Sequence, residues 1–126
     1  MGGPINFSED LNWLDSPASL EPTIECVKIV KSLGMDVGID FHGRVHRPMA
    51  KQFAAALEPL HPIFIEEPVP LDHPAELARL AQQTSIPIAL GERLYTRWDF
   101  RPMLESGAVD IIKPDVAHCG GISELR

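Results

Sequence analysis

The chain has 126 residues, of which 44% are hydrophobic and 23% charged, and its formal net charge at pH 7 is −7. This length suits a single domain with a hydrophobic core, and the acidic balance argues against nucleic acid or an anionic membrane as a partner, because no basic stripe is present to neutralise phosphates. No apolar run approaches the roughly 18 residues that a membrane span needs, and the N-terminal residues lack the regions of a signal peptide, so we expect a cytoplasmic protein.

The predicted elements alternate between helices and short apolar strands. The first is a helix over 19–34, in which apolar residues recur near helical spacing and Gly34 supplies a C-terminal cap. The strand over 63–68, IFIEEP, is an apolar run that ends in two adjacent carboxylates and a proline. The other predicted elements are strands over 37–41, 86–92 and 109–115, helices over 49–60, 73–84 and 98–107, and the start of a helix over 120–126.

Four apolar strands that alternate with helices indicate parallel β/α units. Two architectures fit this pattern, a doubly wound sheet and a (β/α)8 barrel. No G-x-G-x-x-G motif follows a strand and no Walker A motif is present, so the nucleotide-binding version of the doubly wound sheet has no support. A barrel of the usual kind needs roughly 200 residues or more, so this chain would form about half of one.

An acidic residue stands at the end of each predicted strand. These residues are Asp40, Glu66, Glu92 and Asp115, and successive acids are 26, 26 and 23 residues apart. Because chemistry collects at the carboxyl ends of parallel strands, and each interval is one β/α unit, we expect these side chains to line one rim. Carboxylates from adjacent strands would repel one another unless a cation held them together.

The cation that fits the first three acids is a hard divalent ion. Oxygen ligands favour Mg²⁺, with Mn²⁺ or Ca²⁺ as alternatives, and the absence of cysteine and histidine at these three positions argues against zinc. The two cysteines, Cys26 and Cys119, have no metal-ligand spacing and are predicted to be reduced, buried thiols.

Four sequence stretches carry a resemblance to a known family. GIDFHGRVH (38–46), FIEEP (64–68), IPIALGERLYTRWDF (86–100) and DIIKPDVAHCGGI (110–122) closely resemble the mandelate racemase/muconate lactonizing enzyme branch of the enolase superfamily. Within that branch they are most similar to acid-sugar dehydratases of the galactonate dehydratase type. The resemblance runs from Leu14 onward, and it implies an α/β fold that is part of a (β/α)8 TIM-type barrel, with about four β/α units present.

The resemblance implies a role for each acid and for one histidine. Asp40, Glu66 and Glu92 match the metal ligands that end the third, fourth and fifth barrel strands, with Mg²⁺ as the expected ion and Mn²⁺ as the alternative. His42 matches the general acid, and Asp115 matches the residue that orients a base histidine on the seventh strand. The implied reaction is the dehydration of a sugar acid, an aldonate such as D-galactonate, to a 2-keto-3-deoxy acid through an enediolate.

The same resemblance implies that residues 1–126 are only part of the enolase-superfamily C-terminal barrel domain. The capping domain, the first and last barrel strands and the base histidine would be absent. We therefore expect a hydro-lyase, and a homo-oligomer, in the full-length context, whereas the isolated chain is expected to be inactive.

Further polar residues near the strand ends are candidates for substrate binding, and the two arginines among them could instead neutralise the acid cluster. Glu67 is expected to be ion-paired rather than a metal ligand, because adjacent strand residues point to opposite faces. The candidates for substrate binding are Arg44, His46, Arg93 and His118.

Two other functions remain open at this stage. A racemase or epimerase of the same superfamily would return the proton without eliminating water, and its usual lysine pair lies on a strand outside this sequence; His42 favours the dehydratase. A non-catalytic chain is the second alternative, because a half-barrel exposes two sheet edges and would need a partner to cover them.

Overall fold

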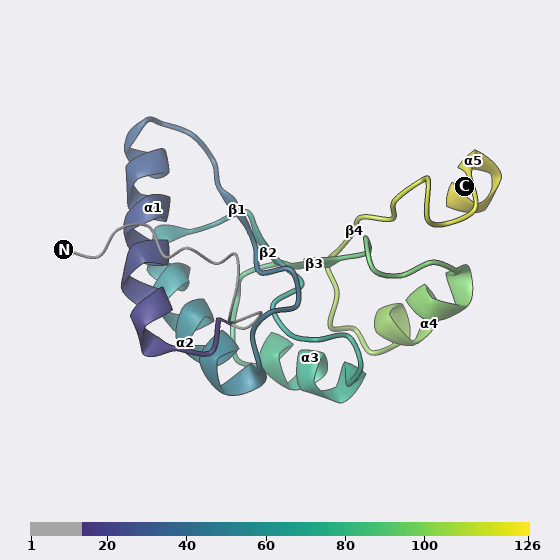
Figure 1. Cartoon of the computed structure of the whole chain (residues 1–126), viewed down its shortest axis with the longest axis horizontal. Helices are drawn as coiled ribbons and strands as arrows, with labels where there is room; N and C mark the ends of the chain where they lie inside the picture. The colour runs from purple at the N-terminus through teal and green to yellow at the C-terminus, as the bar shows by residue number, and fades with distance from the viewer. Residues whose placement is uncertain (1–13) are drawn as a thin grey trace.

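One sheet of four parallel strands organises the computed structural model, which describes residues 14–126 (Figure 1). The strand order follows the sequence, so each strand pairs with the next one along the chain. The strands are β1 (Gly38–Asp40), β2 (Phe64–Glu66), β3 (Ile88–Leu90) and β4 (Ile111–Ile112). The helices are α1 (Leu20–Ser32), α2 (Arg47–Leu57), α3 (Pro74–Ala81), α4 (Arg97–Glu105) and α5 (Ile122–Leu125), with 3-10 turns η1 (Pro17–Ser19) and η2 (Glu58–Leu60).

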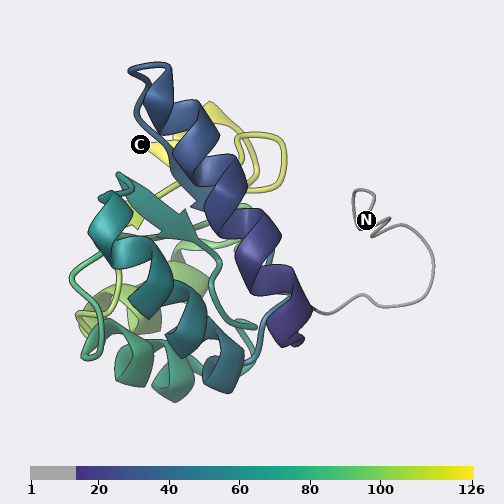
Figure 2. The same ribbon diagram turned by 90° about the vertical axis from the view of Figure 1, so that its left-hand side faces the viewer.

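Helices α1 to α4 follow one another in an arc along one side of the sheet, and α2 and α3 lie side by side (Figures 1 and 2). The core lies between these helices and the two central strands. Every residue of β3 is buried, whereas β1 and β4 at the sheet edges are partly exposed. The largest fully buried apolar side chains are Phe53, Leu57, Ile65, Leu77, Leu80, Ile88 and Leu90.

Helix α2 shows how the sequence pattern produces this packing. Its buried residues recur along one face, and Pro48 occupies the first turn, where its missing N–H removes no helical hydrogen bond. Phe53 from this face packs against Phe41 in a tilted arrangement, with ring centroids 4.9 Å apart. The predicted helix over 49–60 is therefore confirmed, but Pro59 converts its last turn into the 3-10 turn η2.

The two central strands, β2 and β3, end earlier than predicted because the backbone changes conformation immediately after them. Glu67 has φ of 43° and Gly91 has φ of 155°, and both follow a central strand. Hydrogen bonds nevertheless continue between neighbouring strands, from Glu67 N to Ala89 O at 3.0 Å and from Lys113 N to Leu90 O at 2.8 Å. The strand ends therefore stay fixed relative to one another while their side chains are redirected.

Gly91 is expected to be the glycine least tolerant of substitution near the strand ends. A Cβ at this position would lie 2.5 Å from the backbone C and O of Lys113, and its φ of 155° is unfavourable for an L side chain. We expect Gly91→Ala to destabilise the fold by about 2–4 kcal/mol, measured as the free energy of unfolding in urea.

Gly107→Ala is the matched control, because Gly107 also has a positive φ of 67° but nothing lies within 4 Å of its Cβ position. That variant should lower the free energy of unfolding by only about 1 kcal/mol, because the unfavourable backbone conformation contributes but no close contact does. Equal losses in the two variants would show that the close approach to Lys113 has no energetic weight.

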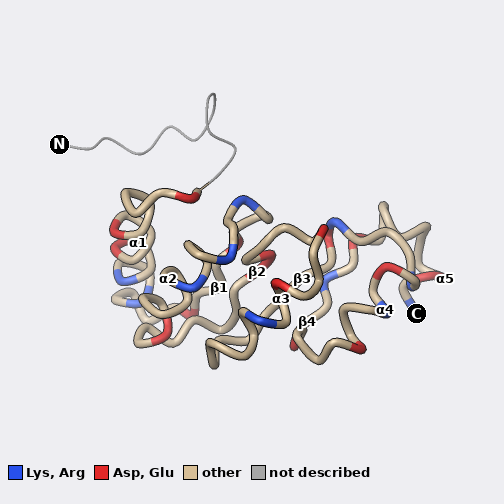
Figure 3. Tube along the Cα trace, turned by 90° about the horizontal axis from the view of Figure 1, so that it is seen from below, with Lys and Arg blue, Asp and Glu red and all other residues tan. Residues whose placement is uncertain are grey.

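Charges of both signs are spread over the described part of the chain. Figure 3 shows Lys and Arg positions interspersed with Asp and Glu positions along the trace, so neither sign forms a continuous stripe there. Among the described residues, no helix combines the length and the apolar character that crossing a membrane requires.

The two cysteines differ from the sequence prediction. Both are free thiols, as predicted, but Cys26 is exposed and Cys119 is only half-buried, so their predicted burial is wrong. On α1 it is the next residue, Val27, that faces the core, with 4% of its surface exposed. Helix α1 buries only one face, and Val27 lies on that face whereas Cys26 does not. The apolar character of cysteine alone therefore does not predict its burial.

Candidate metal and acid–base site

The acids predicted at the strand ends lie at the carboxyl edge of the sheet. Asp40 ends β1 and Glu66 ends β2, while Glu92 follows β3 by two residues. Asp40 and Glu66 are partners in the register of β1 and β2. Register partners on parallel strands place their side chains on the same face of the sheet, so these two carboxylates project to the same side.

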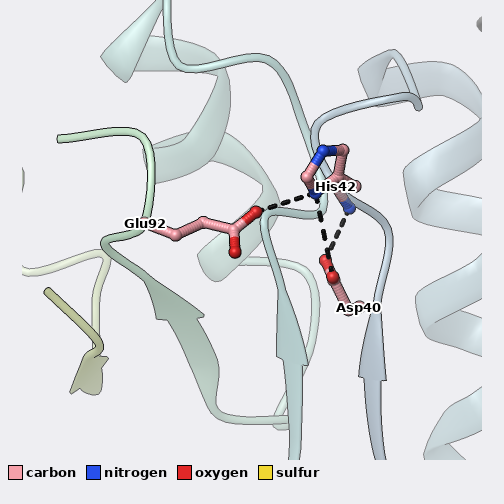
Figure 4. Close-up of side chains that lie close together, drawn as sticks. All are labelled: Asp40, His42 and Glu92. Atoms are coloured by element: carbon pink, nitrogen blue, oxygen red, sulfur yellow. Dashed lines mark hydrogen bonds and ion pairs between the residues drawn. The ribbon is translucent and has the colours of Figure 1, made fainter. Parts of the chain in front are cut away.

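Asp40, His42 and Glu92 form a close cluster (Figure 4). One possible ligand atom of each residue lies within 4.8 Å of those of the other two. His42 Nδ1 is 2.7 Å from Glu92 Oε1 and 3.9 Å from Asp40 Oδ2. The structure thus brings together two predicted metal ligands and the predicted general acid, each of which is partly exposed.

A tight turn after β1 places His42 in this cluster. The His42 backbone N–H donates to Asp40 Oδ1 at 2.7 Å, and His42 has a left-handed φ of 53°. The following Gly43 N–H donates to Glu67 O at 2.9 Å, which ties the turn to the end of β2. Left-handed non-glycine residues are uncommon and often mark functional positions, and histidine is among the residues enriched there.

Glu66 is the most deeply buried of the predicted ligands, with 4% of its surface exposed. Lys113 Nζ donates a hydrogen bond to Glu66 Oε2 and forms an ion pair with it. The same ammonium group lies 5.2 Å above the centre of the Phe64 ring. Lys113 is not among the site residues predicted from the sequence. A signal was present, because Lys113 lies two residues before Asp115 and residues two apart on an extended chain point to the same face.

Glu67 is fully buried and forms the ion pair that the sequence predicted. Its Oε2 lies 3.2 Å from Arg93 Nε. Burial raises the pKa of the Glu67 carboxyl to about 7, although the positive charge of Arg93 acts in the opposite direction. Arg93 therefore contributes to holding the turn that carries His42, in addition to any contact with substrate.

Asp115 and His118 lie together after β4. Asp115 Oδ1 accepts a hydrogen bond from Ala117 N at 2.7 Å, and its Oδ2 is 3.6 Å from His118 Nδ1. The His118 ring packs edge-on against Tyr95, and its Nδ1 is 3.4 Å from the backbone oxygen of Glu92. These two residues are thus next to the cluster but outside it, and their roles stay predictions.

Three of the four candidates for substrate binding line two cavities, and His118 lines neither of them. His42, Arg44 and Arg93 line a cavity of about 420 Å³ together with Asp72. His46 lines a second cavity, of about 480 Å³, and its ring is held by Asp15, which also accepts a hydrogen bond from the His46 backbone N–H at 2.8 Å. The structure therefore brings Arg44 and Arg93 to the His42 cavity and places His46 in the second one.

The donor set of the cluster fits a hard divalent ion. Glu92 Oε1 is itself covered, although the side chain is 38% exposed, and His42 Nδ1 lies 2.7 Å from it, a contact that carries positive charge only when the ring is protonated. A carboxylate oxygen that is covered from water is favourable only where a donor or a positive charge meets it. Carboxylates at the ends of adjacent strands are the ligands that Mg²⁺ and Mn²⁺ prefer.

Comparison with known proteins gives consistent results. The model of the enolase C-terminal domain-like family matches residues 6–126. The D-galactonate dehydratase of Variovorax paradoxus (strain S110) is 46% identical over 125 residues, which are 97% of this chain and 33% of that protein. The D-galactonate dehydratase of Ralstonia nicotianae (strain ATCC BAA-1114 / GMI1000) is 42% identical over 123 residues, 95% of this chain and 32% of that protein. The chain thus spans about a third of the length of these curated relatives.

Solved structures agree with the sequence relatives. A mandelate racemase/muconate lactonizing enzyme-like protein from Rubrobacter xylanophilus DSM 9941 superposes with a TM-score of 0.82 at 41% identity, over 87% of this chain and 29% of that one. A member of the enolase superfamily from Salmonella Typhimurium superposes with a TM-score of 0.83 at 34% identity, over 94% of this chain and 31% of that one.

Proposed function

The chain belongs to the enolase C-terminal domain-like family, with the α/β fold of a partial (β/α)8 barrel, and from this premise we propose that its protein dehydrates a sugar acid in a Mg²⁺-dependent reaction. The proposed substrate is an aldonate such as D-galactonate, and the product is the 2-keto-3-deoxy acid. The observation that carries the proposal is the cluster of Asp40, His42 and Glu92 at the strand ends, with Glu66 beside Asp40.

The proposed metal ligands are Asp40, Glu66 and Glu92, with Mg²⁺ as the ion and Mn²⁺ as the alternative. When bound, such an ion supplies positive charge that stabilises the negative charge developing on the substrate carboxylate. Asp40 and Glu66 are fixed by the register of β1 and β2, and Glu92 is fixed by the turn at Gly91. Rigid strand ends are suited to holding ligands at defined positions.

His42 is the proposed donor of the proton that leaves with the 3-hydroxyl group. Imidazole can donate a proton near neutral pH, and this ring lines the cavity of about 420 Å³ rather than the core. Its backbone is held at both sides, by Asp40 Oδ1 and through the Gly43 N–H, so the ring is presented from a fixed position. Asp115 is the proposed partner that orients the base histidine, which the family pattern places on a later strand.

The cationic lining of the same cavity supports an anionic, polyhydroxylated substrate. Arg44 has no ion-pair partner among the residues that the structure describes, so its guanidinium is available to a ligand oxygen. Asp72 lies in the same lining and can accept hydrogen bonds from hydroxyl groups. His46 and His118 are proposed substrate contacts of lower rank, because one lines the second cavity and the other packs against Tyr95.

The proposed activity can be tested in a chimera, because the chain spans about a third of its curated relatives. In this chimera the chain replaces the matching 125 residues of the Variovorax paradoxus D-galactonate dehydratase. We expect the purified chimera to convert D-galactonate to the 2-keto-3-deoxy acid with Mg²⁺ and to lose this activity with EDTA. The product is measured as the 2-keto acid by its semicarbazone absorbance.

The parent enzyme and the 126-residue chain alone serve as controls, and the chain alone is expected to be inactive. A chimera that is folded by circular dichroism and melts cooperatively, but converts neither D-galactonate nor any other aldonate, would overturn the proposed function. Conversion that is unaffected by EDTA would overturn its metal dependence.

A further inference from the structure

Lys113 is a cationic group at the strand ends to which the proposed mechanism gives no role. We propose that Lys113 acts as a competing counter-ion: it stabilises the fold around buried Glu66 and, by holding that carboxylate, weakens the binding of a divalent ion there. This inference rests on the proposed role of Glu66 as a metal ligand. It makes Lys113 a positioning residue, because it acts through Glu66 rather than on substrate.

The contacts of Lys113 are specific to its ammonium group. Nζ bonds to Glu66 Oε2 and lies 5.2 Å above the centre of the Phe64 ring, so a carboxylate and an aromatic face both attract it. Ala89, the β3 residue in register with Glu66, is small and fully buried. A small residue at this place leaves room for the lysine side chain to cross β3 and reach β2.

The burial of Glu66 explains why Lys113 should stabilise the fold. The Glu66 side chain is only 5% exposed, whereas that of Lys113 is 44% exposed. A buried carboxylate without a positive partner is strongly unfavourable, but an exposed ammonium without a partner is not. Removing the charge of Lys113 should therefore lower the stability of the fold more than removing the charge of Glu66 would.

The same positive charge opposes a second cation at Glu66. A divalent ion that binds Glu66 approaches the ammonium group, and like charges repel strongly in a partly buried site. The Lys113 backbone is fixed by its N–H bond to Leu90 O at 2.8 Å and by the close packing of Gly91. The flexible side chain can still move away, so exchange of one cation for another requires no movement of the strands.

Lys113→Gln tests this inference in the chimera, which is called the unchanged chain when it carries no substitution, with Lys113→Arg as the conservative variant and Lys51→Gln as the matched control. Lys51 is an exposed lysine on α2, outside the strand ends. The probe is Mn²⁺, whose free fraction is measured by electron paramagnetic resonance, and stability is measured by urea unfolding in EDTA. We expect Lys113→Gln to bind Mn²⁺ about tenfold more tightly than the unchanged chain and to unfold in EDTA at about 1 M lower urea.

The two effects have opposite signs, which a merely structural lysine would not produce. Lys113→Arg keeps the positive charge, so its Mn²⁺ affinity and its urea midpoint should stay close to those of the unchanged chain. Lys51→Gln should alter neither quantity. Weaker or unchanged Mn²⁺ binding in Lys113→Gln, or no Mn²⁺ binding in any of these chains, would overturn the inference.

Glu66→Gln separates this inference from the proposed function. If Glu66→Gln binds Mn²⁺ as tightly as the unchanged chain does, Glu66 is not a ligand, and the proposed metal site fails together with the inference. If Glu66→Gln loses Mn²⁺ binding while Lys113→Gln binds no more tightly than the unchanged chain, the metal site stands and only the role of Lys113 is wrong.

Discussion

Glu66→Gln is expected to lower turnover of D-galactonate by the chimera at least about 100-fold at saturating Mg²⁺. The substitution keeps the size of the side chain but removes one negative charge from the proposed ligand set. Because the substrate carboxylate gains negative charge in the reaction, a weaker hold on the ion affects the transition state more than the ground state. The measurement is the rate of 2-keto acid formation across a Mg²⁺ titration.

The fold is expected to survive this change. Lys113, which loses its partner in Glu66→Gln, is 44% exposed and can be solvated in place. Glu105→Gln is the matched control, since Glu105 is an exposed carboxylate whose partner is Arg101 on the same helix. Full activity of Glu66→Gln at saturating Mg²⁺, or an equal loss in Glu105→Gln, would count against Glu66 as a ligand.

His42→Asn in the chimera is expected to slow elimination of the 3-hydroxyl group by about 100-fold or more, the usual contribution of a general acid. Exchange of the α-proton should survive, because the proposed base is a different histidine that acts with Asp115. Nuclear magnetic resonance of D-galactonate in D₂O should then show deuterium at C2 without formation of the keto product.

Asparagine is chosen because it tolerates the left-handed conformation that His42 adopts at φ of 53°. His61→Asn is the matched control, since His61 is an exposed histidine with φ of 50°. Dehydration at the unchanged rate in His42→Asn would make His42 a structural residue. The racemase or epimerase alternative would then gain the most support, because such an enzyme needs no acid at the 3-hydroxyl.

Helical spacing, short apolar runs and the positions of proline and glycine were sufficient to place the five α-helices and four strands of the described chain, although η1 was not predicted. They could not place the ends of the strands. Those ends depend on the positive φ of Glu67 and on Gly91, which lets the chain approach the backbone of Lys113. Such contacts join different β/α units, and no local pattern in the sequence encodes them.

For the candidate site, the sequence was sufficient to predict the edge of the sheet on which the acids lie, but not all of their contacts. Parallel topology alone places Asp40, Glu66 and Glu92 at one edge of the sheet, because acids at strand ends share that edge. The bond between Lys113 and Glu66 was not predictable, since it crosses β3 and depends on the register of three strands and on a small residue between them. The metal-binding role of the three acids stays a prediction.

The sheet order also bears on how the chain folds. Gly38 pairs with Phe64, Ile65 with Ile88 and Ala89 with Ile111, so paired residues are 26, 23 and 22 positions apart. The entropy lost on closing a loop grows only with the logarithm of its length, and chains whose contacts are local in sequence fold faster than those with distant pairings. Since β2, β3 and β4 each pair with the strand just before them in the sequence, we expect the sheet to form from short-range contacts, one strand after another.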